Sequence, residues 1–188
     1  MSEALSALPG AAFKGLVTIE DAGLRGMITL RGDLADAKLK SAVKSAAGVE
    51  VPDARRALLA DEAGALWMSP DELLILAPYA RANETVAALS SALGGVHHLA
   101  VNVSDARAVF CMSGAGWREV LGKLSPADLH LDAFGPGEVR RTRLAQVAAA
   151  FWTMEEDKVE VVCFRSVARY VFELLANAAD APAPVGHY

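Results

Sequence analysis

The chain has 188 residues, of which 53% are hydrophobic and 22% charged, with a formal net charge of -5. This composition is typical of a globular domain and excludes the low-hydropathy, high-charge class of disordered proteins. The acidic balance argues against a nucleic-acid partner. Apolar stretches such as residues 146–152 are far shorter than the ~20 residues of a membrane span. We therefore expect no nucleic-acid or membrane partner.

The N-terminus and the cysteines indicate the compartment. Glu3 lies close to the start, and no basic segment precedes a long apolar run, so no secretory signal is expected. Cys111 and Cys163 each lie in an apolar segment without CxxC spacing. Such cysteines are typical of buried free thiols in a reducing environment. The sequence therefore predicts a cytoplasmic protein.

The first half of the chain predicts a strand, a helix, three short strands and a second helix. Residues 1–25 lack periodicity, which indicates an N-terminal arm or a loose edge strand. Residues 26–33 alternate like a half-buried strand, and Asp33 can cap the helix that follows. Residues 57–78 read as three strands separated by two acidic turns. Asn83 is the expected N-cap of the next helix.

The second half follows the same order, with an irregular connector inserted after its first helix. The connector is rich in Pro and Gly, and the last helix is amphipathic. The expected segments are a strand at 96–105, a strand at 107–116, a helix at 116–124, the connector at 125–138, a long strand, an acidic turn and a further strand within 139–164, a helix at 165–179 and a flexible tail at 180–188.

The recurring order indicates a tandem duplication within an α+β fold. Each unit consists of a strand, a helix, a strand hairpin and a helix, and the expected units are residues 26–95 and 106–178 of a single domain 26–179. A chance match between two alanine-rich segments is the alternative. The residues expected at equivalent positions are Leu30 with Met112, Leu73 with Val159, and Trp67 with Trp152.

Residues suited to catalysis or metal binding are sparse. His97 and His98 are adjacent in an expected strand, so their rings should point to opposite faces, away from a common metal. His130 and His187 have no evident partner. Neither a GxSxG, an HExxH, a P-loop nor a GxGxxG motif occurs. We therefore expect no catalytic, cofactor-binding or metal-binding residue in this chain.

One region carries a family resemblance. Residues 103–147, "VSDARAVFCMSGAGWREVLGKLSPADLHLDAFGPGEVRRTRLAQV", resemble the gamma subunit of heterotetrameric sarcosine oxidase. The "LRGD", "WMSPDELLIL" and "FRSVARYVFELL" segments extend the likeness to residues 26–176. Leu73, Ala115 and Ser125 depart from the family pattern. The most specific matches lie in the connector, at Pro126, Asp128, Leu129, His130, Ala133, Phe134, Pro136 and Gly137.

The resemblance implies a non-catalytic subunit with a shortened version of the fold of the folate-binding aminomethyltransferase T-protein of glycine cleavage. The family's complex demethylates sarcosine to glycine, releases hydrogen peroxide and forms methylenetetrahydrofolate. FAD, FMN, NAD and tetrahydrofolate are then expected in the partner subunits, which are alpha, beta and delta. The alternatives are a stand-alone folate-binding one-carbon protein and a generic scaffolding module.

An obligate subunit needs a docking surface, and two segments are candidates. Residues 2–25 and the connector both carry apolar residues among turn formers, a pattern suited to lying extended on another protein. The alternative for Leu129 and Phe134 is that they plug the gap between the two units. The interface candidates are Phe13, Leu16, Leu129, Phe134, Arg141 and Arg143.

Overall fold

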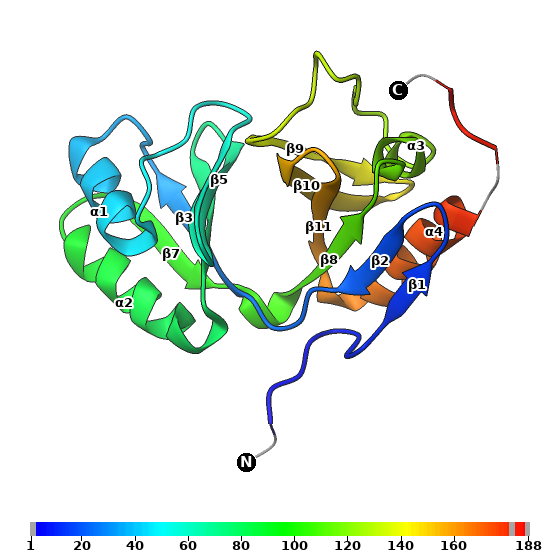
Figure 1. The fold of residues 1–188 in the computed structure, drawn as a ribbon. Helices are drawn as coiled ribbons and strands as arrows, with labels where there is room; N and C mark the ends of the chain where they lie inside the picture. The colour runs from blue at the N-terminus through cyan, green and yellow to red at the C-terminus, as the bar shows by residue number, and fades with distance from the viewer. Residues whose placement is uncertain (1–2, 181–182, 187–188) are drawn as a thin grey trace. The chain divides into compact units, whose positions relative to one another are not determined.

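The computed structural model describes residues 3–180 and 183–186. It consists of two compact units, each with a sheet covered by helices on one face (Figure 1). One, here called the continuous unit, is formed by Arg25–Asp105. The other, the split unit, combines Met1–Leu24 with Ala106–Tyr188. None of the helices among the described residues is long and apolar enough to span a membrane.

The continuous unit contains a five-stranded antiparallel sheet in the order β4-β5-β6-β3-β7. Helices α1 and α2 pack on one face, where they bury an aliphatic core. Its elements are β3 (Gly26–Gly32), α1 (Ala37–Ala47), β4 (Ala57–Ala60), β5 (Ala63–Ser69), β6 (Glu72–Ala77), the 3-10 helix η1 (Tyr79–Arg81), α2 (Ala82–Ala92) and β7 (His98–Asn102).

The ends of these two helices differ in part from the expectation. Asp36, not Asp33, caps α1, and its carboxylate accepts hydrogen bonds from the backbone N–H groups of the next turn. Gly48 ends α1 in the left-handed conformation, with φ of 71°. No side chain caps α2: the helix begins at Ala82, so Asn83 lies within its first turn, where its side chain accepts a hydrogen bond from Asn102.

The split unit contains a six-stranded antiparallel sheet in the order β1-β2-β8-β11-β10-β9. Helix α4 packs on it and contacts α3. Its elements are β1 (Ala12–Lys14), β2 (Thr18–Asp21), β8 (Arg107–Ser113), α3 (Trp117–Gly122), β9 (Glu138–Leu144), β10 (Val147–Glu155), β11 (Lys158–Phe164), the 3-10 helix η3 (Arg165–Val167) and α4 (Ala168–Asp180); the 3-10 helix η2 (Ser104–Ala106) links the two units.

Residues 139–155, expected as one long strand, form two. The chain reverses at Ala145, which has φ of 49°, so that β9 and β10 pair with each other. Alanine rarely adopts this conformation, and the segment carries no Gly, Pro or Asn to indicate a turn. The sequence pattern therefore hid the turn.

The N-terminal segment, expected as an arm or a loose edge strand, lies within the sheet of the split unit. β2 pairs with β8 along four residues, and β1 pairs with β2. Val17 and Ile19 are buried in the core of this unit. These residues contribute to folding of the split unit and are not a detachable extension.

The two sheets repeat one pairing pattern. In the continuous unit Leu30 pairs with Leu73, and in the split unit Met112 pairs with Val159. All four side chains lie in the cores under the helices. The strand order β4-β5-β6-β3 is likewise matched by β9-β10-β11-β8. The α+β prediction is confirmed, and the duplication accounts for this shared register.

The expected equivalence of Trp67 and Trp152 is wrong by one residue. Trp152 pairs with Glu160, and the position equivalent to Glu160 in the continuous unit is Leu74, which pairs with Leu66. Trp152 therefore corresponds to Leu66, not to Trp67. Because side chains alternate between the faces of a strand, a one-residue shift places the two indoles on opposite faces. Trp67 is half-buried and Trp152 is fully buried.

Each sheet is completed by the segment that precedes the first strand of the other repeat: β1 and β2 in the split unit, and β7 in the continuous unit. β2 lies before β3 in the sequence but pairs with β8. β7 lies before β8 but pairs with β3. This reciprocal exchange explains why residues 1–24 belong to the split unit and not to the repeat that follows them.

Candidate functional site

Two of the described histidines have a neighbouring oxygen atom from a nearby residue. His98 Nδ1 lies 2.9 Å from the backbone oxygen of Val96. His130 Nδ1 lies 3.5 Å from the exposed carboxylate of Asp132. Within residues 3–180 and 183–186, no group of three or more His, Cys, Asp or Glu side chains could hold a metal ion. His187 and part of the predicted tail, residues 181–182 and 187–188, lie outside the described residues.

The two thiols are poorly suited to nucleophilic chemistry. Burial raises the pKa of Cys163 to about 12, although the nearby Arg107 charge acts in the opposite direction. Burial also raises the pKa of Cys111. Because the thiolate is the reactive form, these raised pKa values disfavour nucleophilic chemistry at neutral pH.

The connector is organised around Phe134. Its ring packs edge-on against Trp117 and Phe151, with centroid distances of 5.8 and 5.4 Å. The guanidinium of Arg140 lies 4.9 Å from the ring centroid and donates a hydrogen bond to the Ala133 carbonyl oxygen. The connector is therefore tied to the core of the split unit by an aromatic cluster.

A buried arginine fixes the other half of the connector. Arg118 stacks over Trp117 and donates a 2.7 Å hydrogen bond to the backbone oxygen of Leu129. Leu129 and Phe134 are both 0% exposed. Both belong to the hydrophobic core of the split unit, so in this conformation their side chains are covered by the chain itself.

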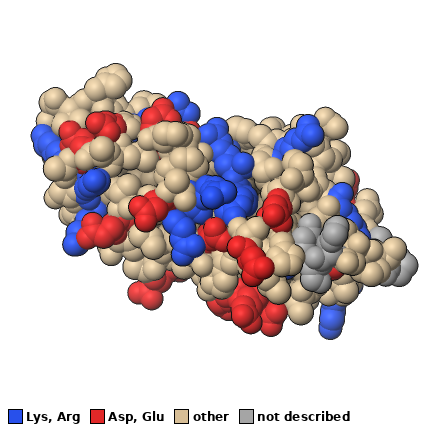
Figure 2. All heavy atoms as spheres, turned by 90° about the horizontal axis from the view of Figure 1, so that it is seen from above, with Lys and Arg blue, Asp and Glu red and all other residues tan. Residues whose placement is uncertain are grey.

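The other four docking candidates remain accessible to different degrees. Phe13 is half-buried against the core of the split unit, and Leu16 is 50% exposed. Arg141 and Arg143 are exposed and lie on the same face of β9, as their two-residue spacing predicts. Figure 2 shows acidic side chains interspersed with the basic ones on the drawn face, so that face does not present a uniform positive surface.

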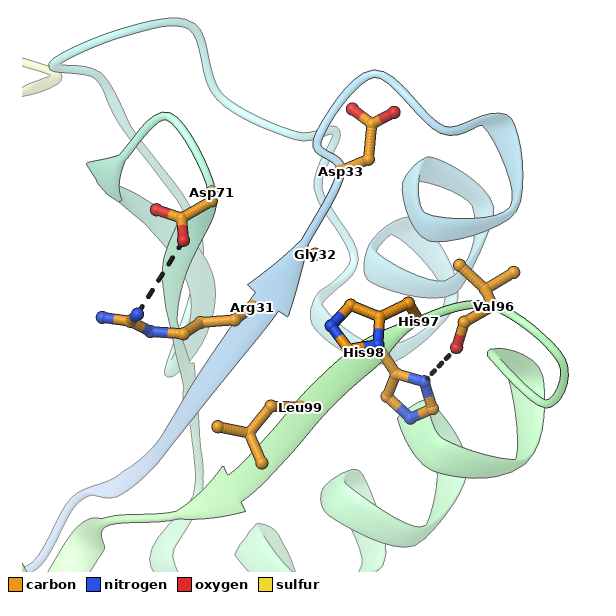
Figure 3. Close-up of a pocket in the computed structure, with 8 residues that line it drawn as sticks. All are labelled: Arg31, Gly32, Asp33, Asp71, Val96, His97, His98 and Leu99. Carbon is orange, nitrogen blue, oxygen red and sulfur yellow. Dashed lines mark hydrogen bonds and ion pairs between the residues drawn. The ribbon is translucent and has the colours of Figure 1, made fainter.

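An open groove lies within the continuous unit, beside the start of β7 (Figure 3). Its volume is about 710 Å³. Arg31 points toward Asp71 across the groove and forms a 2.6 Å ion pair with Glu72. The residues lining it are Arg31, Gly32, Asp33, Asp71, Val96, His97, His98 and Leu99.

Strand β7 borders this groove, and the sequence did not single it out. It is an outer strand of the sheet formed by the described residues. Leu99 and Val101, 50% and 41% exposed, lie on the same face of this strand. The available signal was the absence of Lys, Arg, Asp or Glu between positions 96 and 102.

Comparison with known proteins identifies the family. The model of the sarcosine oxidase, gamma subunit family matches residues 31–181. The chain belongs to this family. A curated sarcosine oxidase subunit gamma from Arthrobacter sp. is 36% identical over 97 residues, which are 52% of this chain and 47% of that protein. The chain thus spans about half the length of the curated gamma subunits it matches.

Two solved structures support the fold of this gamma-family chain. One is the heterotetrameric sarcosine oxidase from Corynebacterium sp. U-96, with a TM-score of 0.81 and 24% identity over 92% of this chain and 90% of the matched chain. The other is the glycine cleavage aminomethyltransferase T from Bartonella henselae, with a TM-score of 0.58 and 18% identity over 80% of this chain and 43% of that chain. The predicted T-protein-like fold is confirmed.

Proposed function

We propose that the chain is a non-catalytic gamma subunit of a cytoplasmic heterotetrameric sarcosine oxidase. The observation that carries the proposal is the family match over residues 31–181. In this role the chain stabilises a complex that demethylates sarcosine to glycine and forms hydrogen peroxide and methylenetetrahydrofolate. The flavins, NAD and tetrahydrofolate belong to the alpha and beta subunits, and alpha is the direct neighbour of this chain.

The way the chain uses its residues supports a structural role. The most specific family motif, the connector, contributes Leu129 and Phe134 to the core, and its arginine partners bind backbone oxygens. Both thiols are kept protonated by burial. A family motif that packs into the core is consistent with a subunit whose role is to present a rigid surface to its partners.

Co-expression with the alpha, beta and delta subunits tests the proposal. A tag on this chain should recover a complex with a flavin absorption spectrum that releases peroxide from sarcosine. The chain expressed alone should be colourless and release none. Failure to recover any of these subunits, or peroxide release by the isolated chain, would overturn the proposal.

The likeness to aminomethyltransferase T favours one other candidate, a stand-alone folate-binding protein. Titration of the isolated chain with tetrahydrofolate, followed by calorimetry, distinguishes the two. The gamma-subunit proposal expects no binding at millimolar folate. Micromolar binding together with failed co-purification would favour the stand-alone protein.

A further inference from the structure

We propose that the free edge of β7 accepts an extended strand of a partner subunit, which extends the sheet of the continuous unit by one strand. The inference rests on the proposed function, because it names the contact through which this chain joins the complex. Three observations carry it: the orientation of the β7 backbone, the lack of protection along its edge, and the adjacent groove.

The pairing with β3 shows which backbone groups face outward. The N–H of Val103 donates a 2.8 Å hydrogen bond to the Met27 oxygen, so position 103 bonds to β3. Antiparallel strands alternate between hydrogen-bonded and non-hydrogen-bonded pairs. Val101 and Leu99 therefore bond to β3, while His98, Ala100 and Asn102 direct their backbone N–H and C=O groups to the open edge. These groups form a template for one more strand.

The other outer strands are protected against such pairing, and β7 is not. β1 has three residues and ends in Lys14. β9 carries Glu138 and three arginines. β4 has four residues and follows Arg56. β7 has no Lys, Arg, Asp or Glu, no proline and no bulge, and it exposes two apolar residues. Natural edge strands use charges, bulges or short length to prevent pairing, so an unprotected edge indicates a partner.

The groove indicates the chemistry of the incoming segment. Its lining contains Asp33, Asp71 and Arg31, and Arg31 pairs with both Asp71 and Glu72, so these four side chains carry three formal negative charges against one positive charge. The groove therefore has an excess of negative charge at the His98 end of β7. A strand that continues the antiparallel sheet runs from the Asn102 end toward this groove. The expected segment thus has apolar residues that pack on Leu99 and Val101, followed by Lys or Arg.

The available area favours a partner subunit over a second copy of this chain. β7 has only five residues, and pairing two such edges alone would bury far less than the ~1,200–2,000 Å² typical of stable interfaces. A larger subunit can add contacts around the strand and fill the groove. The occupant is therefore assigned to the heterotetramer.

Two substitutions block the edge, one at the exposed Val101 and one at Ala100, which is partly buried against the core of the continuous unit. Val101→Lys places a charge on the exposed face of the strand. Ala100→Pro removes an outward-facing N–H while the bonds from Leu99 and Val101 to β3 remain. Met154→Lys is the matched control, because Met154 is 38% exposed and lies in β10 of the split unit. Circular dichroism and thermal unfolding of each isolated chain establish that it folds.

Co-purification with the alpha, beta and delta subunits provides the main measurement. Val101→Lys and Ala100→Pro should each lower the recovered complex at least tenfold, and Met154→Lys should leave it unchanged. In the wild-type complex, hydrogen–deuterium exchange of peptides covering residues 97–103 should slow at least tenfold relative to the isolated chain.

The outcomes separate this inference from the proposed function. The strand-edge inference alone is overturned if both folded variants assemble as well as the wild type and if hydrogen–deuterium exchange at residues 97–103 does not slow in the complex. Failure of the wild-type chain to assemble overturns both. The choice of partner is overturned if the wild-type chain forms a homodimer that Val101→Lys disrupts while assembly with the alpha, beta and delta subunits is unchanged. The edge then belongs to a second copy of this chain.

Discussion

Replacing Phe134 with alanine distinguishes a core role for the connector from a docking role. The side chain is fully buried, and its ring has two edge-on aromatic neighbours and a guanidinium near its face. Truncation of a buried Phe to Ala costs about 3–5 kcal/mol. Because edge-on aromatic pairs contribute about 0.5–1.5 kcal/mol each beyond area burial, we expect the upper half of that range, about 4–5 kcal/mol.

Two further variants divide this free energy into its parts. Phe134→Leu keeps most of the buried volume but loses the ring contacts, so it should cost about 1–2 kcal/mol. Phe164→Ala is the surface control, since Phe164 is 45% exposed and stacks on Arg107. An exposed cation–π contact is worth about 0.5–1 kcal/mol, so this variant should lose no more than that.

Urea denaturation, followed by circular dichroism and tryptophan fluorescence, measures these differences. Coincident transitions by the two probes would justify a two-state fit. Loss of about 4–5 kcal/mol should also lower Tm by about 10 °C or more in a chain of this size. The reasoning fails if Phe134→Ala unfolds within about 1 kcal/mol of wild type, because the ring would then not be a core residue.

Three other perturbations give separate tests. Burial raises the pKa of Cys163 above its value in the unfolded chain, so the stabilising effect of the protonated thiol is complete below pH 9 and is lost as pH rises toward about 12. Cys163→Ala should therefore show a shallower decline in unfolding free energy over this pH window. Equal slopes for the variant and the wild type would contradict the assignment. Ile19→Ala in β2 should cost about 2–5 kcal/mol, and deletion of residues 3–20 should unfold the split unit by circular dichroism; a native spectrum after the deletion would show that β2 is dispensable. Gly64→Ala places a Cβ 2.5 Å from the Leu58 carbonyl oxygen and should cost about 1–3 kcal/mol in thermal denaturation, whereas an unchanged Tm would show that the backbone yields.

The fold could be predicted where local patterns and turn residues agree. The two acidic turns within residues 57–78 separate three apolar runs of strand length, and these runs form β4, β5 and β6. The turn at Ala145 was hidden because its residues have no turn preference. The pairing of β2 with β8 joins segments about ninety positions apart, and local periodicity carries no information on such a partner.

The candidate docking residues show a different limit. An apolar residue among turn formers looks the same in sequence whether its own core or a partner covers it. Phe134 is covered by its own core, while Leu16 is half-exposed. The one-residue error for Trp152 has a related cause, because aligning similar letters does not determine strand register. The burial of each side chain distinguishes Phe134 from Leu16, and the pairing of the strands distinguishes the position of Trp152 from that of Trp67.

The reciprocal exchange of β2 and β7 sets the order in which the chain can finish folding on the ribosome. The first repeat can complete its sheet only after β7 has been synthesised, near residue 102. β2 emerges early and must wait for β8, which begins at residue 107. Domains generally fold as units during synthesis. A gene split between β7 and β8 would therefore give one fragment that holds the complete continuous unit together with β1 and β2, and a second fragment whose sheet lacks those two strands.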